Sequence, residues 1–229
     1  MTLIFCRELS AADWIVHSEL PWHQLVGFGP AGFDAHARLR FLPDPTRPGQ
    51  SENEVELEDW RTDQMPKLLE VLATNTATPD DCYFCVWEGF ADANVNGDDD
   101  ALYVNDQNAG ASLKWPDAQP GVAPQAAGSP SMPHLPKVVV PNRAYWLFRG
   151  PLADVGTWDT AQEWPGNYRL DEAGPAFVWP GDHAWCVAMD VDPHWAGIGG
   201  TAALITQLTT DPRLDLVPAD PTKDQPFYQ

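Results

Sequence analysis

Two aspartates and a histidine near the C-terminal end of the chain have a spacing that fits metal or acid–base chemistry. They lie in the run from Phe177 to Gly200, FVWPGDHAWCVAMDVDPHWAGIGG. Asp190 and Asp192 share one face of an extended chain, and His194 follows closely. Carboxylates and imidazoles transfer protons and bind metal ions, so Asp190, Asp192 and His194 are the candidate catalytic residues. The alternative is a buried strand that ends in a polar turn, because Asp before Pro is also common in turns.

A second candidate is the acidic stretch ADANVNGDDD, which fits the opening D-x-[DN]-x-[DN]-G of a calcium-binding loop. The side chains that would supply oxygen ligands are Asp92, Asn94, Asn96 and Asp98. The twelfth loop position, normally a bidentate Glu, is Tyr103. We therefore expect a weak calcium site or a solvated acidic loop. The sequence gives no grounds for any cofactor other than calcium.

Tryptophans raise the question of a ligand-binding surface, since the chain has 11 of them. Aromatic faces stack on sugars, bases and cations, and they also fill protein cores. The candidate ligand-binding residues are Trp22, Trp158, Trp164 and Trp195. Both interpretations stay open for these four side chains.

Two further patterns are more simply explained by structure than by chemistry. Cys82 and Cys85 form a CxxC, but in a strand they point to opposite faces and cannot hold one metal ion. The glycines of AGIGGTAALI lack the phosphate-loop pattern, and we expect them to form a turn between a strand and a helix.

The hydrophobic pattern predicts the elements that must position these residues. Alternation and aromatic-rich runs predict strands, and apolar residues at helical spacing predict helices. The predicted strands cover 35–41, 82–88, 144–148 and 184–189, with a short one at 138–140, and the predicted helices lie within 63–76 and 200–212. Strands and helices mix without a strict βαβ rhythm. This favours an α+β fold with a mostly antiparallel or mixed central sheet.

One long segment, about 91–136, has little regular pattern. It begins acidic and continues rich in Pro, Gly and Ala. A stretch of this kind inside a compact domain is usually an insertion. We therefore expect residues 1–229 to form a single α+β domain that carries an irregular insertion.

The composition limits the kinds of partner that we expect for this chain. The formal net charge is −20, from 33 acidic and 13 basic side chains. Such a charge repels nucleic-acid phosphates and anionic lipids, so neither is an expected partner, whereas a basic protein is. The start of the chain, MTLIFCRELSAADW, lacks the apolar run of a signal peptide or a membrane span. With only four cysteines, the expected location is the cytoplasm.

Several runs resemble signature segments of an actinobacterial protein family without a known activity. They are DWIVHSELPW, LVGFGPAGF, ARLRFLPDP, TPDDCYFCVWEG, YWLFRGPL and WPGDHAWCVAMDVDPHWAGIGG. The resemblance covers nearly the whole chain except about 91–136, and it implies a bacterial cytoplasmic single-domain protein. The C-terminal DPRLDLVPADP is similar in general character to bacterial immunity-type proteins, in which an α+β domain neutralises a toxin.

Two functions follow as hypotheses. The first is a non-enzymatic binding protein, of immunity type, whose acidic surface meets a basic protein partner. The second is a metal-dependent hydrolase that uses Asp190, Asp192 and His194. A convergent polar pocket around those three side chains favours the enzyme, and an exposed surface rimmed by carboxylates favours the binding protein.

Overall fold

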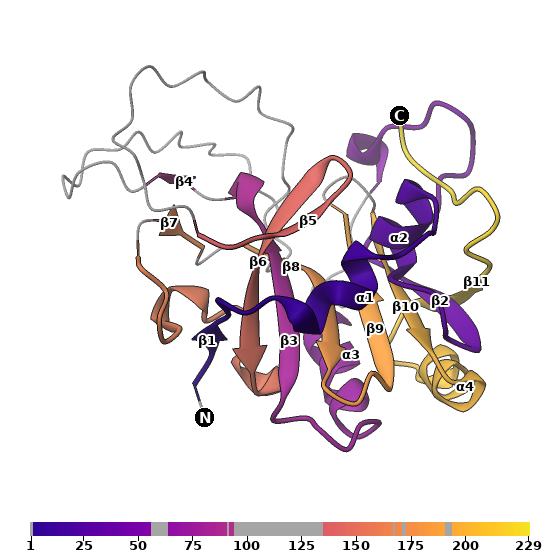
Figure 1. Cartoon of the computed structure of the whole chain (residues 1–229). Helices are drawn as coiled ribbons and strands as arrows, with labels where there is room; N and C mark the ends of the chain where they lie inside the picture. The colour runs from indigo at the N-terminus through magenta and orange to yellow at the C-terminus, as the bar shows by residue number, and fades with distance from the viewer. Residues whose placement is uncertain are drawn as a thin grey trace.

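The three-dimensional structure of the chain is a computed structural model. It describes residues 2–55, 64–90, 92–93, 135–166, 168–170, 173–190 and 194–229. These residues form an α+β fold built on one large antiparallel sheet (Figure 1). The prediction of an α+β fold with a mostly antiparallel sheet is confirmed.

The main sheet has nine strands within the described residues, in the order β1-β6-β3-β8-β9-β10-β2-β11, with β5 paired to β6. Every neighbouring pair in it is antiparallel. The strands are β1 (Ile4–Phe5), β2 (Ala35–Arg40), β3 (Cys82–Trp87), β5 (Val138–Val140), β6 (Arg143–Gly150), β8 (Pro175–Pro180), β9 (Trp185–Ala188), β10 (Trp195–Gly200) and β11 (Leu216–Ala219). A separate small sheet pairs β4 (Asp92–Ala93) with β7 (Tyr168–Arg169).

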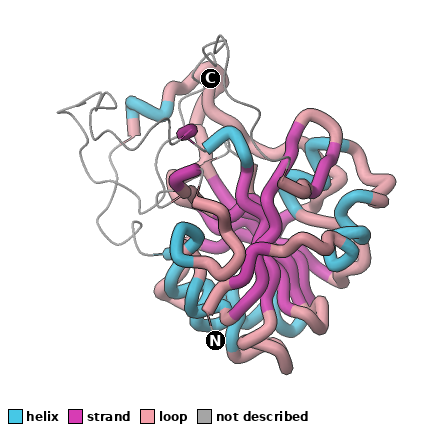
Figure 2. The backbone as a smooth tube through the Cα atoms, turned by 60° about the vertical axis from the view of Figure 1, so that its left-hand side comes forward, coloured by secondary structure: helices cyan, strands magenta, loops and turns pink. Residues whose placement is uncertain are grey.

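Helices cover both faces of the main sheet, as Figures 1 and 2 show. The α-helices are α1 (Asp13–Val16), α2 (Trp22–Phe28), α3 (Gln64–Ala73) and α4 (Ala202–Thr210). Short 3-10 turns lie at Ser10–Ala12, Glu52–Glu54, Glu88–Phe90, Leu152–Asp154 and Trp158–Thr160. Buried residues of α3 and α4 join the hydrophobic cluster on one face, and those of α1 and α2 join the cluster on the other.

The central strands alternate their side chains between the two clusters. In β9, Trp185 and Val187 pack in the cluster with α3 and α4, while Cys186 and Ala188 pack in the cluster with α1 and α2. This alternation explains why the sequence of β9 is apolar at every position, since a strand covered on both sides has no solvent-facing residue.

The predicted strands and helices are present. The strands predicted at 35–41, 82–88, 138–140, 144–148 and 184–189 correspond to β2, β3, β5, β6 and β9. The predicted helices correspond to α3 and α4. Most of the segment predicted as an insertion, 94–134, lies outside the described residues.

The prediction that the glycine-rich run forms a turn is wrong. Residues Trp195–Gly200 form the fully buried strand β10, which pairs with β9 on one side and β2 on the other. The physical reason is the close approach of α2. A Cβ atom on Gly197 would lie 1.9 Å from the carbonyl oxygen of Gly27, and one on Gly199 would lie 2.4 Å from the Phe33 ring. Glycine is therefore required in this strand, although it is normally depleted from strands.

We predict that Gly197→Ala lowers the free energy of unfolding by about 1–3 kcal/mol, because backbone atoms of α2 would have to move. The control is Gly200→Ala in the same strand. There the new Cβ meets the Leu204 Cδ2 atom at 2.9 Å, and a flexible side chain can turn away. Denaturant unfolding of both variants is the measurement. Equal losses for the two variants would contradict this account of β10.

Candidate functional site

Asp190 is part of an aromatic and charged cluster at one end of the sheet. Its Oδ1 atom lies 3.2 Å from Nη2 of Arg143, the first residue of β6. The Arg143 guanidinium carbon lies 5.5 Å from the ring centroid of Trp22 and 5.0 Å from that of Trp87. The Asp190 carboxylate therefore neutralises a cation that stacks on two indole rings.

His194 belongs to a different cluster, which lies just beyond the C-terminal end of β2. Its side chain is only 1% exposed, and Nε2 lies 3.3 Å from Oδ1 of Asp44. The same carboxylate accepts two hydrogen bonds from Arg38, at 2.7 and 3.1 Å. Burial lowers the pKa of His194, although the hydrogen bond to Asp44 opposes this effect.

The two described members of the predicted trio Asp190, Asp192 and His194 thus contact different partners. Asp190 pairs with Arg143, His194 contacts Asp44, and Asp192 lies outside the described residues. No group of three or more His, Cys, Asp or Glu side chains suited to a metal ion occurs within the described ranges.

The polar network around His194 continues across the sheet edge. Arg40 donates to Oδ1 of Asp215 at 2.5 Å. Gln64, which is fully buried, donates to the Arg40 carbonyl at 2.6 Å and accepts a hydrogen bond from the Asp215 amide at 2.5 Å. Buried polar groups need such partners, so the network ties α3 to β2 and to the start of β11.

Only part of this network could be predicted from the sequence. Alternation in 35–41 places Arg38 and Arg40 on one face of a strand, which signals a polar patch there. Gln64 and Asp215 carry no local signal, because helix packing and strand pairing bring them to the network from distant parts of the chain. Asp44 joins it through the short loop that follows β2.

The C-terminal tail covers His194. The Tyr228 ring lies 4.7 Å from the His194 ring in an edge-to-face arrangement, and its hydroxyl donates to the Pro43 carbonyl at 2.5 Å. The imidazole is thereby shielded from solvent by Tyr228 on one side and faces Asp44 on the other.

The tryptophans considered as ligand-binding residues are mostly core residues. Trp158 is fully buried and its Nε1 donates to the Ala173 carbonyl at 2.8 Å. Trp164 and Trp195 are also buried. Only Trp22 of the four is partly exposed, and its ring packs on Arg143.

The residues of the candidate calcium loop fall almost entirely outside the described part of the chain. Asp92 lies in β4, where its backbone pairs with Arg169 of β7. Asn94, Asn96 and Asp98 lie outside the described residues.

The prediction for the CxxC pair is confirmed. Cys82 and Cys85 are both buried in β3 and belong to the clusters on opposite faces of the sheet. Burial raises the pKa of the Cys82 thiol to about 12 and that of Cys85 well above its usual value. Neither thiol is therefore a nucleophile near neutral pH.

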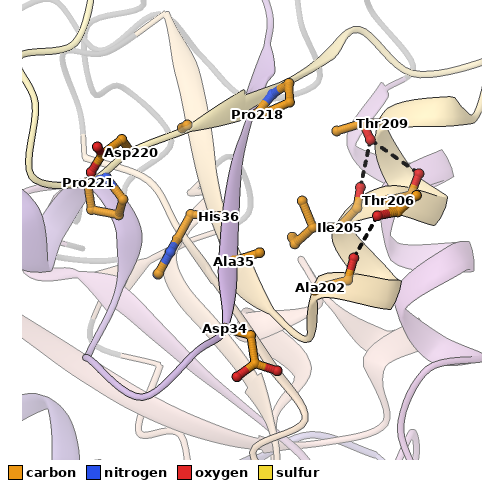
Figure 3. A pocket seen from close by; sticks show the side chains of 11 residues that line it. Asp34, Ala35, His36, Ala202, Ile205, Thr206, Thr209, Pro218, Asp220 and Pro221 are labelled. Atoms are coloured by element: carbon orange, nitrogen blue, oxygen red, sulfur yellow. Dashed lines mark hydrogen bonds between the residues drawn. The ribbon is translucent and has the colours of Figure 1, made fainter.

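A cavity of about 530 Å³ lies at the corner of the sheet where β11 ends (Figure 3). β11 pairs with β2 only as far as Ala219 opposite His36, while β2 begins one residue earlier at Ala35. Side chains of α4 form one side of the cavity, and His36, Asp220 and Pro221 form the other. Its lining comprises Asp34, Ala35, His36, Ala202, Ile205, Thr206, Thr209, Pro218, Ala219, Asp220 and Pro221. This cavity has a volume typical of small-ligand sites, and the sequence patterns did not point to it.

The positions on α4 explain the shape of the cavity wall. Ala202, Ile205, Thr206 and Thr209 recur at the spacing of one helix face. Thr201 caps the helix by accepting a hydrogen bond from the Leu204 amide at 3.2 Å. The cavity therefore borders one side of α4 from its first residue, Ala202, to Thr209 near its end.

Comparisons with known proteins give no match, whether with protein-family models, with curated proteins or with solved structures. Within the described residues, none of the helices has the length and apolar character needed to cross a bilayer.

The buried imidazole generates a prediction about pH. Because burial holds the pKa of His194 below its ordinary value, the unfolded chain takes up this proton at a higher pH than the folded chain. Stability is therefore lost as pH falls below about 6.5, by at most about 1.4 kcal/mol per pH unit for one proton. Asp44 faces His194 directly, and Arg38 and Arg40 oppose its protonation by their charge.

We expect His194→Gln to have a smaller loss of unfolding free energy between about pH 7 and about pH 5 than the wild type. Burial also lowers the pKa of His36 and His183, but both remain in the variant, so the difference between the two slopes isolates His194. Denaturant unfolding at each pH is the measurement. Parallel pH profiles for the two proteins would show that His194 does not titrate as described.

Proposed function

We propose that this chain is a binding protein without catalytic activity, whose acidic surface receives a basic protein partner. The proposal includes a single-domain chain and a cytoplasmic setting, and an immunity-type role in which the partner is a toxin. The main observation that supports this proposal is that the arginines with described side chains already pair with carboxylates of the same chain.

Each arginine with a described side chain forms an ion pair, at nitrogen–oxygen distances of 2.5–3.4 Å. The pairs are Arg7–Glu163, Arg38–Asp44, Arg40–Asp215, Arg47–Glu54, Arg143–Asp190, Arg149–Asp81 and Arg213–Asp211. Their positive charges are neutralised locally, so they do not offset the acidic surplus elsewhere.

The acidic surplus is exposed. Exposed carboxylates that form no ion pair within the described residues include those of Glu8, Asp13, Glu19, Asp34, Asp80, Asp182 and Asp224. With a formal net charge of −20, the chain attracts cationic surfaces and repels phosphates over the range of the screening length. A basic protein is the macromolecule that such a field favours.

The cysteines support the cytoplasmic part of the proposal. All four are free thiols, and Cys82, Cys85 and Cys186 are buried. Free thiols are usual in a reducing compartment, where disulfides are rare.

The alternative of a metal-dependent hydrolase at Asp190, Asp192 and His194 has less support. The Asp190 carboxylate is paired with Arg143, and His194 is buried against Asp44. A hydrolytic centre needs side chains that converge on one accessible point, and these two are engaged with different partners.

We predict that the immobilised chain captures one basic protein in stoichiometric amount from lysate of its source cells. Because long-range attraction drives the encounter, the association rate should fall about tenfold or more between about 50 and about 300 mM salt. Surface plasmon resonance with the purified partner measures this rate. A variant with Asp13→Asn, Glu19→Gln, Asp80→Asn and Asp224→Asn should associate more slowly.

The matched control carries Gln207→Ala and Thr210→Ala, which change exposed side chains without a change of charge. The proposal fails if no stoichiometric partner is captured, or if the association rate is indifferent to salt and to the four neutralising substitutions. Turnover in a panel of hydrolase substrates, lost in Asp190→Asn, would instead favour the enzyme.

A further inference from the structure

The corner cavity lined by β2, α4 and the end of β11 has a polar lining that is almost entirely hydrogen-bond accepting. The Thr206 hydroxyl donates to the Ala202 carbonyl at 2.8 Å, and the Thr209 hydroxyl donates to the Ile205 carbonyl at 2.8 Å (dashed in Figure 3). Their hydrogens are thereby committed to the helix backbone. A hydroxyl oxygen that has donated its hydrogen still has lone pairs, so both present acceptors.

Two carboxylates add negative charge to the cavity. Asp34 is exposed where the chain enters β2, and it forms no ion pair within the described residues. Asp220 accepts hydrogen bonds from the Thr222 hydroxyl at 2.7 Å and the Thr222 amide at 3.0 Å, and these bonds lower the pKa of its carboxyl group. These bonds therefore favour the anionic form of the Asp220 carboxyl group.

Among the residues that the structure describes, no lysine or arginine lines the cavity. Lys223 lies beside the cavity, with its Nζ 3.4 Å from Oδ2 of Asp220 and its side chain 76% exposed. An exposed pair of this kind is weak, so a cation entering the cavity can compete with Lys223 for the carboxylate.

His36 lines the part of the cavity near Asp220 and Pro221, on the other side of β2 from the α4 side chains (Figure 3). Its ring packs edge-on against Phe28 and Phe33, at centroid distances of 5.9 and 6.3 Å. Burial lowers the pKa of His36 although the charge of Asp220 opposes this, so the ring is neutral near pH 7. A neutral imidazole retains one nitrogen as an acceptor and adds no positive charge.

The rest of the lining is apolar. Ala35, Ala202, Ile205, Pro218 and Pro221 supply aliphatic surface between the polar groups. This combination suits a ligand with an aliphatic stem and a charged end that only donates hydrogen bonds. An anion is disfavoured, because the carboxylates of Asp34 and Asp220 in the lining would repel it.

We infer that this cavity binds an alkylammonium or alkylguanidinium group. Two sources share that chemistry, namely a lysine or arginine side chain of a protein partner and a free aliphatic amine. The first source rests on the proposed function, whereas the second does not.

The experiment follows amide chemical shifts of Ile205, Thr206 and Thr209 during titration with three probes. They are Nα-acetyl-lysine methylamide, 1,5-diaminopentane and the neutral Nα-acetyl-norleucine methylamide. Saturable shifts are expected with the two amines, with dissociation constants on the order of 1 mM for ligands of this size. The neutral probe should bind at least about tenfold more weakly, since it lacks the charged donor group.

Two sets of variants locate the site. Asp34→Asn and Asp220→Asn should each weaken amine binding by roughly three- to tenfold, whereas Glu19→Gln, which removes a charge elsewhere, should not. Thr206→Lys places an ammonium group at the cavity and should abolish binding. Gln207→Lys adds the same charge to the neighbouring exposed position of α4, which does not line the cavity, and should change binding by less than about twofold.

The inference is overturned if the neutral probe binds as well as the amines, or if binding survives Thr206→Lys unchanged. Tighter binding of the diamine than of the lysine derivative, by about tenfold, assigns the cavity to free amines. Competition between the lysine derivative and the captured partner, with partner binding lost in Thr206→Lys, assigns it to a partner side chain.

The outcomes also separate this inference from the proposed function. Partner capture that is indifferent to Thr206→Lys and to the amine probes rejects the cavity as the contact and leaves the acidic binding surface standing. Amine binding at the cavity without any captured partner rejects the proposed function and leaves the cavity inference standing.

Discussion

The close packing of α2 on β10 is the constraint on which much of the structure depends. With no side chain at Gly197, the α2 backbone approaches so closely that a Cβ there would lie 1.9 Å from the Gly27 carbonyl oxygen. Trp195, at the start of β10, packs against Phe28 at the end of α2, with ring centroids 5.2 Å apart. The first residue of α2, Trp22, packs on Arg143 at the other end. One close contact between a helix and a strand thereby positions aromatic rings at both polar clusters.

The polar cluster around Arg38 is a consequence of this packing. The Arg38 guanidinium lies 5.5 Å from the Trp195 ring centroid and is almost fully buried, so it needs a carboxylate, which Asp44 supplies. Removing one partner of such a buried pair generally costs about 3–5 kcal/mol, because an unpaired charge remains inside the protein. The pair therefore constrains the loop after β2 and, through Asp44, the position of His194. In that role these charged groups determine structure rather than chemistry.

Local residue patterns predict individual strands and helices, whereas contacts between distant parts of the chain cannot be predicted from them. Alternation in 35–41 and helical spacing in α3 are local patterns, and they predicted their elements correctly. For β10 the local pattern predicted a turn, and this was wrong. Its glycines are present because α2 packs closely against the strand, and no neighbouring residue in the sequence indicates that contact. Partners of His194 and Asp190 were equally hidden, because Asp44 and Arg143 reach them only through tertiary packing. The corner cavity depends on where β11 ends and on which face α4 presents, and neither is readable from residue types.

The acidic surface and the corner cavity would contribute differently to the recognition of a partner. An acidic surface attracts any cation, and its influence fades over roughly 8 Å at physiological salt, so it raises encounter rates without choosing a partner. Selection of one partner over others requires short-range contacts whose geometry is fixed before binding. At the corner cavity the Thr206 and Thr209 hydroxyls are oriented by the α4 backbone, and His36 is held between Phe28 and Phe33. Oxygen lone pairs also coordinate metal cations, so it is the aliphatic lining of Ala35, Ile205 and Pro218 that favours an alkylammonium group over an inorganic cation. Under the inferred binding of an alkylated cation, the corner cavity would add short-range selectivity to the long-range attraction of the acidic surface.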